Sequence, residues 1–334
     1  DVDIIHNRNT LQSNLLIMKK IIYYILYALV YIFSLIPLRI LYLFTDIVWL
    51  LMYLCPPLRY RRKIVRKNLV ASFPEKSLKQ IRSIERRFYR NFLDQILESL
   101  KVASMSERWI ERHVEIVNYE KVREQVASGH SVMVYMGHMG NWEWIPSLAL
   151  KFKDMEELRP YVCQIYHRLQ NPVTDMLMLK LREKYGAISI PMALTYRQLL
   201  EYRNEGKTFI VGMIADQVPL WWNIHYWTYF MNQYTPVFTG AERIARKMAL
   251  KIYYGRTTRK SRGYYRYELI PMYESEPDAE PFAITEKFTR LLEEDIIKDP
   301  PLWLWTHNRW KRTWEGFQEW LAENGLEDKS IGAR

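Results

Sequence analysis

The chain has 334 residues, of which 49 % are hydrophobic and 25 % charged, values typical of a globular protein with one large domain or two ordinary ones. Its 48 basic and 37 acidic residues leave a net charge of +11, which is compatible with nucleic acid, anionic lipid or an acidic protein as partner. Cys55 and Cys163 lie far apart and form no Cys-x-x-Cys pattern, so neither a disulfide framework nor a zinc module is indicated.

Two apolar runs near the N-terminus predict attachment to a membrane. Residues 1–17 are polar and mixed, and we expect them to form a disordered leader before Met18. From Ile21 to Leu38 almost every side chain is apolar or Tyr, and at 1.5 Å per residue this run is just long enough to cross a hydrocarbon layer of about 30 Å. The second run, Ile40–Cys55, either returns as a hairpin or lies along the surface. A pair of buried core helices is the alternative to a membrane anchor.

The predicted anchor, residues 18–56, is followed by the basic stretch Arg59–Lys63 and by Arg66 and Lys67. Basic residues beside a membrane segment mark its cytoplasmic side and attract anionic headgroups. Residues 57–334 show no internal repeat and no low-complexity linker, so they are predicted to form one domain.

Within this domain, apolar periodicity alternates between that of helices and that of strands. Helices are expected at Ser77–Val102, Glu107–His113, Tyr119–Ser128, Pro172–Tyr185, Thr195–Arg203, Gly240–Leu250 and Ala283–Lys298. Strands are expected at Val132–Met136, Tyr161–Tyr166, Ile188–Pro191, Phe209–Ile214, Lys251–Thr257 and Tyr264–Met272. The alternation predicts an α/β fold with a mixed, largely parallel central sheet flanked by helices. Residues 219–238 are predicted to form an aromatic loop that packs in the core, walls an acyl-chain groove or faces the membrane, the last two being favoured.

One stretch concentrates the candidate chemistry. The strand Val132–Met136 leads into a glycine-containing loop, and Asn141 is a good N-cap for a helix over Trp142–Phe152. His138 is therefore expected at the carboxyl end of a strand, with Glu143 in the first helical turn. The loop between them lets the carboxylate reach the imidazole, fix its tautomer and leave the other ring nitrogen free as a general base. The pattern His-x4-Glu is weak by itself, and a structural histidine is the commoner case.

Residues that follow other predicted strands strengthen this interpretation. His167 and Arg168 follow one strand, and Asp216 and Gln217 follow another. Ligands of largely parallel sheets bind at the carboxyl ends of the strands, so these residues are expected to share a site with His138. The motifs typical of nucleotide hydrolysis, dinucleotide binding, zinc proteases and serine hydrolases are absent from the sequence.

The order of several motifs resembles that of the lipid A secondary, or late, acyltransferases within the lysophospholipid acyltransferase superfamily. After the apolar helix come Asn68-Leu-Val-Ala-Ser-Phe-Pro74, Gly137-His-Met-Gly-Asn-Trp-Glu143, Tyr166-His-Arg-Leu-Gln-Asn-Pro172 with Arg182 behind it, Ala215-Asp-Gln217, Pro236-Val-Phe-Thr-Gly240 and Trp305-Thr-His-Asn-Arg309. The resemblance covers most of the chain after residue 18, and it implies a glycerolipid acyltransferase-like sheet behind an N-terminal membrane helix or hairpin.

The resemblance implies that His138 and Glu143 are the catalytic pair, with His138 as general base and Glu143 orienting its ring. The residues that it implies for substrate binding are Asn141, Arg168, Arg182, Asp216, Gln217, Thr239, His307 and Arg309. Arg182 is a candidate partner for a phosphate or for a structural carboxylate. Two motifs depart from the family pattern. His307-Asn308-Arg309 replaces His-Arg-Arg, and Tyr166-His-Arg-Leu replaces Tyr-Arg-Pro-Leu.

The implied reaction moves a fatty acyl chain from acyl carrier protein to a hydroxyl of a lipid A precursor, on the cytoplasmic face of the bacterial inner membrane. A coenzyme A thioester is the alternative donor, and neither a metal nor a cofactor is required. Donors for the oxyanion are expected among the backbone amides near Gly137–Gly140 or from a cationic side chain. Acyl transfer to another membrane lipid (a lysophospholipid, aminolipid or glycolipid) and a catalytically inactive lipid-binding protein are the competing interpretations.

Overall fold

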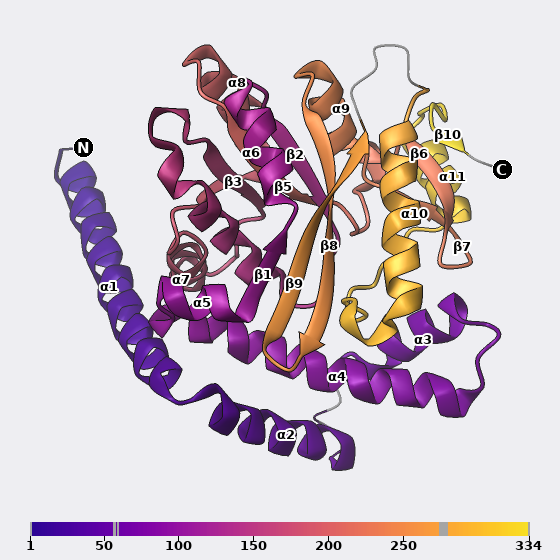
Figure 1. Ribbon diagram of the computed structural model, residues 1–334, viewed down its shortest axis with the longest axis horizontal. Helices are drawn as coiled ribbons and strands as arrows, with labels where there is room; N and C mark the ends of the chain where they lie inside the picture. Colours follow the sequence, from indigo (N-terminus) through magenta and orange to yellow (C-terminus); the bar gives the residue numbers. More distant parts are fainter. Residues whose placement is uncertain (1, 56–57, 59, 274–279, 333–334) are drawn as a thin grey trace.

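The computed structural model describes residues 2–55, 58, 60–273 and 280–332, with side chains from residue 17 onwards. Arg59 and the predicted boundary between residues 56 and 57 lie outside these residues. A seven-stranded sheet, in the order β1-β9-β8-β2-β5-β3-β4, forms the middle layer of the molecule (Figure 1). Its strands are β1 (Val114–Val117), β2 (Val132–Met136), β3 (Tyr161–Tyr166), β4 (Ile188–Pro191), β5 (Phe209–Ile214), β8 (Lys251–Ser261) and β9 (Tyr264–Tyr273). The strands from β8 to β4 are parallel, whereas β9 and β1 run the opposite way, so the predicted α/β fold with a largely parallel sheet is confirmed.

Helices cover both faces of this sheet, which explains why its central strands read as continuous apolar runs. The described helices of the domain are α3 (Arg62–Ser72), α4 (Leu78–Lys101), α5 (Glu107–His113), α6 (Tyr119–Ala127), α7 (Pro172–Arg182), α8 (Thr195–Asn204), α9 (Gly240–Lys247), α10 (Ala283–Lys298) and α11 (Trp314–Glu323), with 3-10 segments η2 (Val102–Ser104), η3 (Trp142–Leu158), η4 (Met192–Leu194), η5 (Trp221–Asn223) and η6 (Pro300–Leu302). In β2, Val132 and Val134 pack with α6 and η3, whereas Met133 and Tyr135 pack with α8, α9 and α10. The sheet therefore separates two apolar cores.

The segment after Asn141 differs from the expectation of an α-helix over Trp142–Phe152. The structure has a longer 3-10 segment, η3, which contains Pro146. A proline inside a helix has no N–H to donate, and its ring clashes with the preceding turn, which disfavours regular α-helical hydrogen bonding. Helix α7 ends at Arg182, three residues before the predicted end.

The aromatic segment 219–238 is mainly a hairpin with its own small core. Strands β6 (Tyr226–Phe230) and β7 (Gln233–Pro236) pair antiparallel, and β10 (Ile331–Gly332) adds to β6 in parallel. Trp227 is fully buried and packs against Phe317 of α11. Most of this segment is therefore core packing, the option that the sequence did not favour, although its first residues line the cavity described below.

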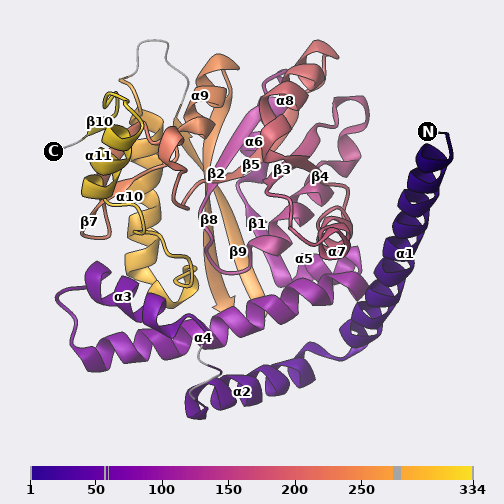
Figure 2. The ribbon, with the colours of Figure 1, turned by 180° about the vertical axis from the view of Figure 1, so that it is seen from behind.

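At the N-terminus, α1 (Val2–Leu35) runs along one side of the domain (Figures 1 and 2). The predicted disordered leader was residues 1–17, and α1 includes residues 2–17 of it; no glycine or proline interrupts the chain before Pro37. Within the described residues, Ile17–Leu35 is the one segment long and apolar enough to cross a membrane, and only 6 % of it is buried.

Helix α2 (Leu38–Leu54) lies along α4 instead of returning beside α1 (Figure 1). The Tyr42 hydroxyl donates to Glu98 at 2.5 Å, and the Thr45 hydroxyl donates to Asp94 at 2.7 Å. The opposite side of α2 exposes a row of large apolar side chains: Ile40, Leu43, Phe44, Ile47, Leu50, Leu51 and Leu54. Such an unpaired apolar face, together with α1, indicates association with a membrane.

Candidate active site

His138 lies where β2 ends, and the preceding position is closely packed, so a side chain there would force a neighbour to move. A Cβ on Gly137 would lie 2.5 Å from Leu292 Cδ1 and 3.3 Å from Asp216 Oδ2. This close approach brings the backbone of His138 within hydrogen-bond distance of the loop after β5. Because β2 and β5 are adjacent parallel strands, the residues that follow each strand meet at the same edge of the sheet.

Asp216, at this edge, is the carboxylate that holds His138. Its Oδ1 lies 2.6 Å from His138 Nδ1, and its Oδ2 accepts from the His138 backbone N–H at 2.8 Å and from Trp303 Nε1 at 2.7 Å. Burial alone would raise the pKa of Asp216, but the His138 ring and these donors lower that pKa to about 2. The carboxylate is therefore ionised at neutral pH and accepts the Nδ1 proton of the imidazole.

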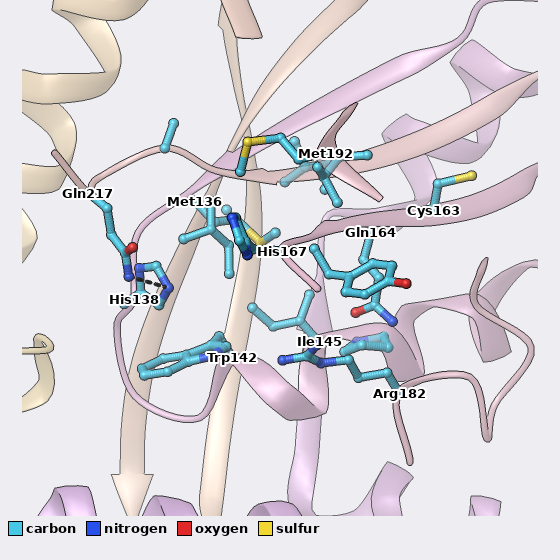
Figure 3. Close-up of a pocket in the computed structure, with 18 of the residues that line it drawn as sticks. Met136, His138, Trp142, Ile145, Cys163, Gln164, His167, Arg182, Met192 and Gln217 are labelled. Atoms are coloured by element: carbon cyan, nitrogen blue, oxygen red, sulfur yellow. Dashed lines mark hydrogen bonds between the residues drawn. The ribbon is translucent and has the colours of Figure 1, made fainter. Parts of the chain in front are cut away.

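With Nδ1 engaged, Nε2 of His138 is the nitrogen available for proton transfer. Gln217 Nε2 lies 3.3 Å from it, and the ring of Trp142 meets the imidazole edge-on with the centroids 4.7 Å apart (Figure 3). The His138 side chain is 16 % exposed, so Nε2 remains accessible. A histidine held in this way by a buried carboxylate can act chemically as a general base.

In the structure Glu143 is bonded to Arg182, whereas the sequence-based prediction paired it with His138. Its two carboxylate oxygens accept from Arg182 Nη2 at 2.6 Å and Arg182 Nε at 2.7 Å. The guanidinium fork matches both oxygens, and Asp216 already occupies the ring nitrogen that Glu143 was expected to bind. Arg182 thus has one of the two roles expected for it, that of a partner to a structural carboxylate.

A cavity of about 490 Å³ opens beside His138. Its walls come from one face of the sheet and from η3, α7 and the loop after β5, and they are mostly apolar; they include Val134, Met136, Ile145, Leu148, Val162, Ile210, Gly212, Ile214, Gly255 and Leu269. In Figure 3, His138 and Gln217 lie at one end of this cavity, and Arg182 and Gln164 lie toward the other. An apolar space that begins beside His138 suits a substrate with a long hydrocarbon chain.

Comparison with known families agrees with this geometry. The family described as bacterial lipid A biosynthesis acyltransferase matches residues 9–312, nearly the whole chain. The protein belongs to this family. It is an acyltransferase of lipid A biosynthesis, as the resemblance of its motifs predicted. No curated protein matches the chain.

Three of the residues predicted to bind substrate lie elsewhere in this acyltransferase. Asn141 is fully buried; its Nδ2 donates to Glu98 Oε2 at 2.9 Å, and its Oδ1 accepts from the Glu143 N–H at 3.2 Å. It is the predicted N-cap, but it is not free to meet a substrate. Arg168 is exposed and Thr239 is buried before α9, and neither lines the cavity beside His138.

His307 and Arg309 lie outside the cavity and hydrogen-bond to chain segments that border it. The His307 Nε2 accepts from the Val218 N–H at 3.3 Å, and burial lowers its pKa to about 4, so the ring is neutral. Arg309 is 1 % exposed and donates to the Pro236 carbonyl at 2.8 Å; burial lowers its pKa to about 10 while the charge of Asp216 opposes that shift. Neither side chain lines the cavity. In this acyltransferase the last motif therefore positions the loops around Asp216.

Sequence reasoning missed the roles of Trp303 and Asn68. Trp303 supplies a donor to Asp216, and Asn68 Nδ2 donates to the carbonyls of Trp305 and His307 at 3.1 and 2.9 Å. Both residues lie in or beside motifs that carry the family resemblance. Their position in these motifs was the signal that could have pointed to them. Local spacing could not, because their hydrogen-bond partners are more than 80 residues away along the chain.

Proposed function

We propose that this protein transfers a fatty acyl chain from a thioester on acyl carrier protein to a hydroxyl of a lipid A precursor, with His138 as general base. The observation that carries the proposal is the His138–Asp216 pair at one end of an apolar cavity in a member of this family. An acyl chain fits the cavity walls, and a thioester carbonyl beside His138 would then lie where the attacking hydroxyl loses its proton. Coenzyme A remains the alternative carrier of the thioester.

In this mechanism His138 Nε2 takes the proton of the acceptor hydroxyl as its oxygen attacks the thioester carbonyl. Asp216 keeps the imidazole in the reactive tautomer and stabilises the imidazolium that forms. The tetrahedral intermediate collapses to the ester, and the departing sulfur receives the proton from His138. A positioned base of this kind contributes about 10²–10⁴-fold to the rate.

The oxyanion of that intermediate needs a hydrogen-bond donor, and three of the four backbone amides expected near Gly137–Gly140 already have acceptors. The amides of His138, Met139 and Gly140 already donate to Asp216, to the Gly137 carbonyl and to the Leu302 carbonyl, respectively. We assign this role to Gln217, whose side-chain amide lines the cavity next to His138 Nε2. Removing a single donor to an oxyanion costs about 10²–10³-fold in kcat in other acyl-transfer enzymes.

The orientation at the membrane is proposed from the distribution of apolar and basic side chains. The exposed apolar residues of α1 and α2 would contact lipid, and Lys63 and Lys67, exposed on α3 just after α2, would contact anionic headgroups on the cytoplasmic face. Arg62 and Arg66 contribute less than the sequence indicated, because both are ion-paired with the buried Glu85.

The test is mass spectrometry of lipid A from cells with the gene, without it, and with the His138→Ala variant in its place. We expect the deletion and the variant to lack the same single acyl chain, with the variant protein present in the membrane at normal amount. Unchanged lipid A in the deletion would refute the proposed acceptor and direct the search to phospholipids and aminolipids. Transfer by His138→Ala at nearly the wild-type rate would refute the mechanism.

A further inference from the structure

A second cavity lies on the opposite face of the sheet, between α8 and α9. It measures about 480 Å³, and its floor includes Met213, from the face of β5 that points away from the first cavity, and Ala215, directly after β5. Its walls include Thr195, Tyr196, Ala241, Arg243, Ile244 and Lys247. The two cavities share the lining residues Ile165, Met192, Ile214, Ala215 and Phe238. They therefore adjoin around the carboxyl edge of β3 and β5, beside the loop that carries Asp216 and Gln217.

The mouth of this second cavity is basic. Arg243 and Lys247 are exposed, one helical turn apart on α9, and Lys247 Nζ lies 4.6 Å from the centroid of the Tyr196 ring. The acidic side chain of α9, Glu242, is 2 % exposed and bonded to Arg246 and Thr285, so it presents no negative charge to a partner. The surface around the cavity thus combines an apolar floor with two accessible cations.

We propose that this surface, defined by α8 and α9, is where an acidic carrier protein docks. This inference rests on the proposed function. The carrier's phosphopantetheine arm lies in the second cavity, with its phosphodiester near Arg243 and Lys247. The thioester at the end of the arm reaches His138, and the acyl chain continues into the first cavity. A single route around the edge of the sheet then accommodates an anion, a narrow flexible arm and a hydrocarbon chain in the order in which the donor carries them.

The location of α8 and α9 suits a water-soluble partner. In both ribbon views these helices lie at the end of the molecule opposite α2, whose outer side is apolar (Figures 1 and 2). A membrane that covers α2 leaves α8 and α9 accessible to a protein from the aqueous side. Charge complementarity mainly accelerates encounter and selects the partner, so binding should weaken as salt rises.

The first test measures the affinity of the purified full-length protein for holo carrier protein, the form with its phosphopantetheine arm, by fluorescence anisotropy at low salt. The variant R243E/K247E is compared with R112E/K121E, which makes the same change in charge at exposed residues of α5 and α6 on the opposite face of the sheet. We expect about tenfold weaker binding or more for R243E/K247E, no change for R112E/K121E, and a flatter salt dependence for the first variant only. Equal binding by R243E/K247E and wild type, or no binding by wild type, would overturn the docking site.

Turnover then separates this proposal from the proposed function. An acyl-pantetheine, which carries the thioester without phosphate or protein, should serve R243E/K247E as well as wild type, which also shows that the variant is folded. With acyl carrier protein as donor, the variant's KM should rise while kcat stays within about twofold. A rise in KM for the lipid acceptor alone would assign the basic surface to the acceptor and overturn the inference. Carrier binding without acyl transfer by wild type would refute the function and leave the docking site standing.

The route between the cavities is tested at Met192, which lines both and is 49 % exposed, so a larger side chain there does not disturb the core. We expect Met192→Trp to bind the carrier protein normally and to lower kcat with the carrier-bound donor at least tenfold. Normal kcat in this variant would overturn the path of the arm.

Discussion

Replacing Asp216 by asparagine tests which carboxylate orients the base, and the structure predicts how the site would respond. One asparagine oxygen must replace two carboxylate oxygens, each of which accepts a hydrogen bond. If the new NH2 group takes the Oδ2 position, it faces two donors, the His138 backbone N–H and Trp303 Nε1. If it takes the Oδ1 position, it faces only the His138 ring. The second arrangement conflicts with fewer donors, and it forces Nδ1 to become an acceptor and Nε2 to carry the proton.

The magnitude follows from the same contacts. The pKa of Asp216 falls from 3.8 to about 2 in spite of burial, so its surroundings favour the charged form by about 2 to 3 kcal/mol. Asp216→Asn removes the negative charge that stabilises the imidazolium and favours the unreactive tautomer, so we expect kcat to fall by about 10²–10⁴-fold.

The assay is steady-state transfer from a saturating acyl thioester to the lipid acceptor, with Glu143→Gln and the thermal unfolding midpoint measured in parallel. Since Glu143 contacts Arg182 and not His138, its variant should retain the shape of the pH–rate profile even where the rate falls. A loss of less than tenfold in folded Asp216→Asn, or a Glu143→Gln variant whose pH–rate profile loses its lower limb, would refute the assignment of Asp216 as the orienting carboxylate.

Three further outcomes are expected. Arg182→Gln should destabilise the protein by about 3 kcal/mol, because it leaves the carboxylate of Glu143, which is 12 % exposed, without its cationic partner. Adding Glu143→Gln to this variant should restore much of the lost stability. Additive effects of the two substitutions on the free energy of unfolding would contradict the pairing. The pKa of His307 lies near 4 in the fold and near 6.5 in an unfolded chain, so its contribution to stability is complete above pH 6.5 and is lost as the pH falls toward 4, by at most about 3 kcal/mol. The unfolding free energy of His307→Gln should therefore depend less on pH over this window. An unchanged pH dependence in this variant would contradict the prediction. Gly212→Val should shift the donor preference to shorter acyl chains, because the valine side chain enters the first cavity, where an added Cβ meets the flexible end of Met136 at 2.9 Å. Each methylene excluded from the cavity costs about 1–3 kcal/mol. An unchanged preference among donors of different length would refute the placement of the acyl chain in this cavity.

Local sequence patterns were sufficient to place most elements of the domain. Val132–Met136 is a strand with the predicted ends because five consecutive apolar residues before a glycine can be buried on both sides of a sheet. Helix α4 begins after Ser77, whose side chain and that of Gln80 form a reciprocal cap, a signal visible in four residues of sequence. The strand–helix alternation then determined the fold class, and the motifs determined the family.

The partner of His138 could not be obtained in this way. Local reasoning selected Glu143, five positions away, because a loop allows the two side chains to meet. Asp216 lies 78 residues away, and it is adjacent only because β2 and β5 pair in parallel and end at the same edge of the sheet. Arg182 reaches Glu143 from α7 for the same kind of reason, across 39 residues. The sequence by itself determined which residue types gather at the carboxyl edge; which carboxylate binds which cation was decided by strand pairing and helix packing, because hydrogen bonds depend on distances of a few ångströms that no sequence spacing records.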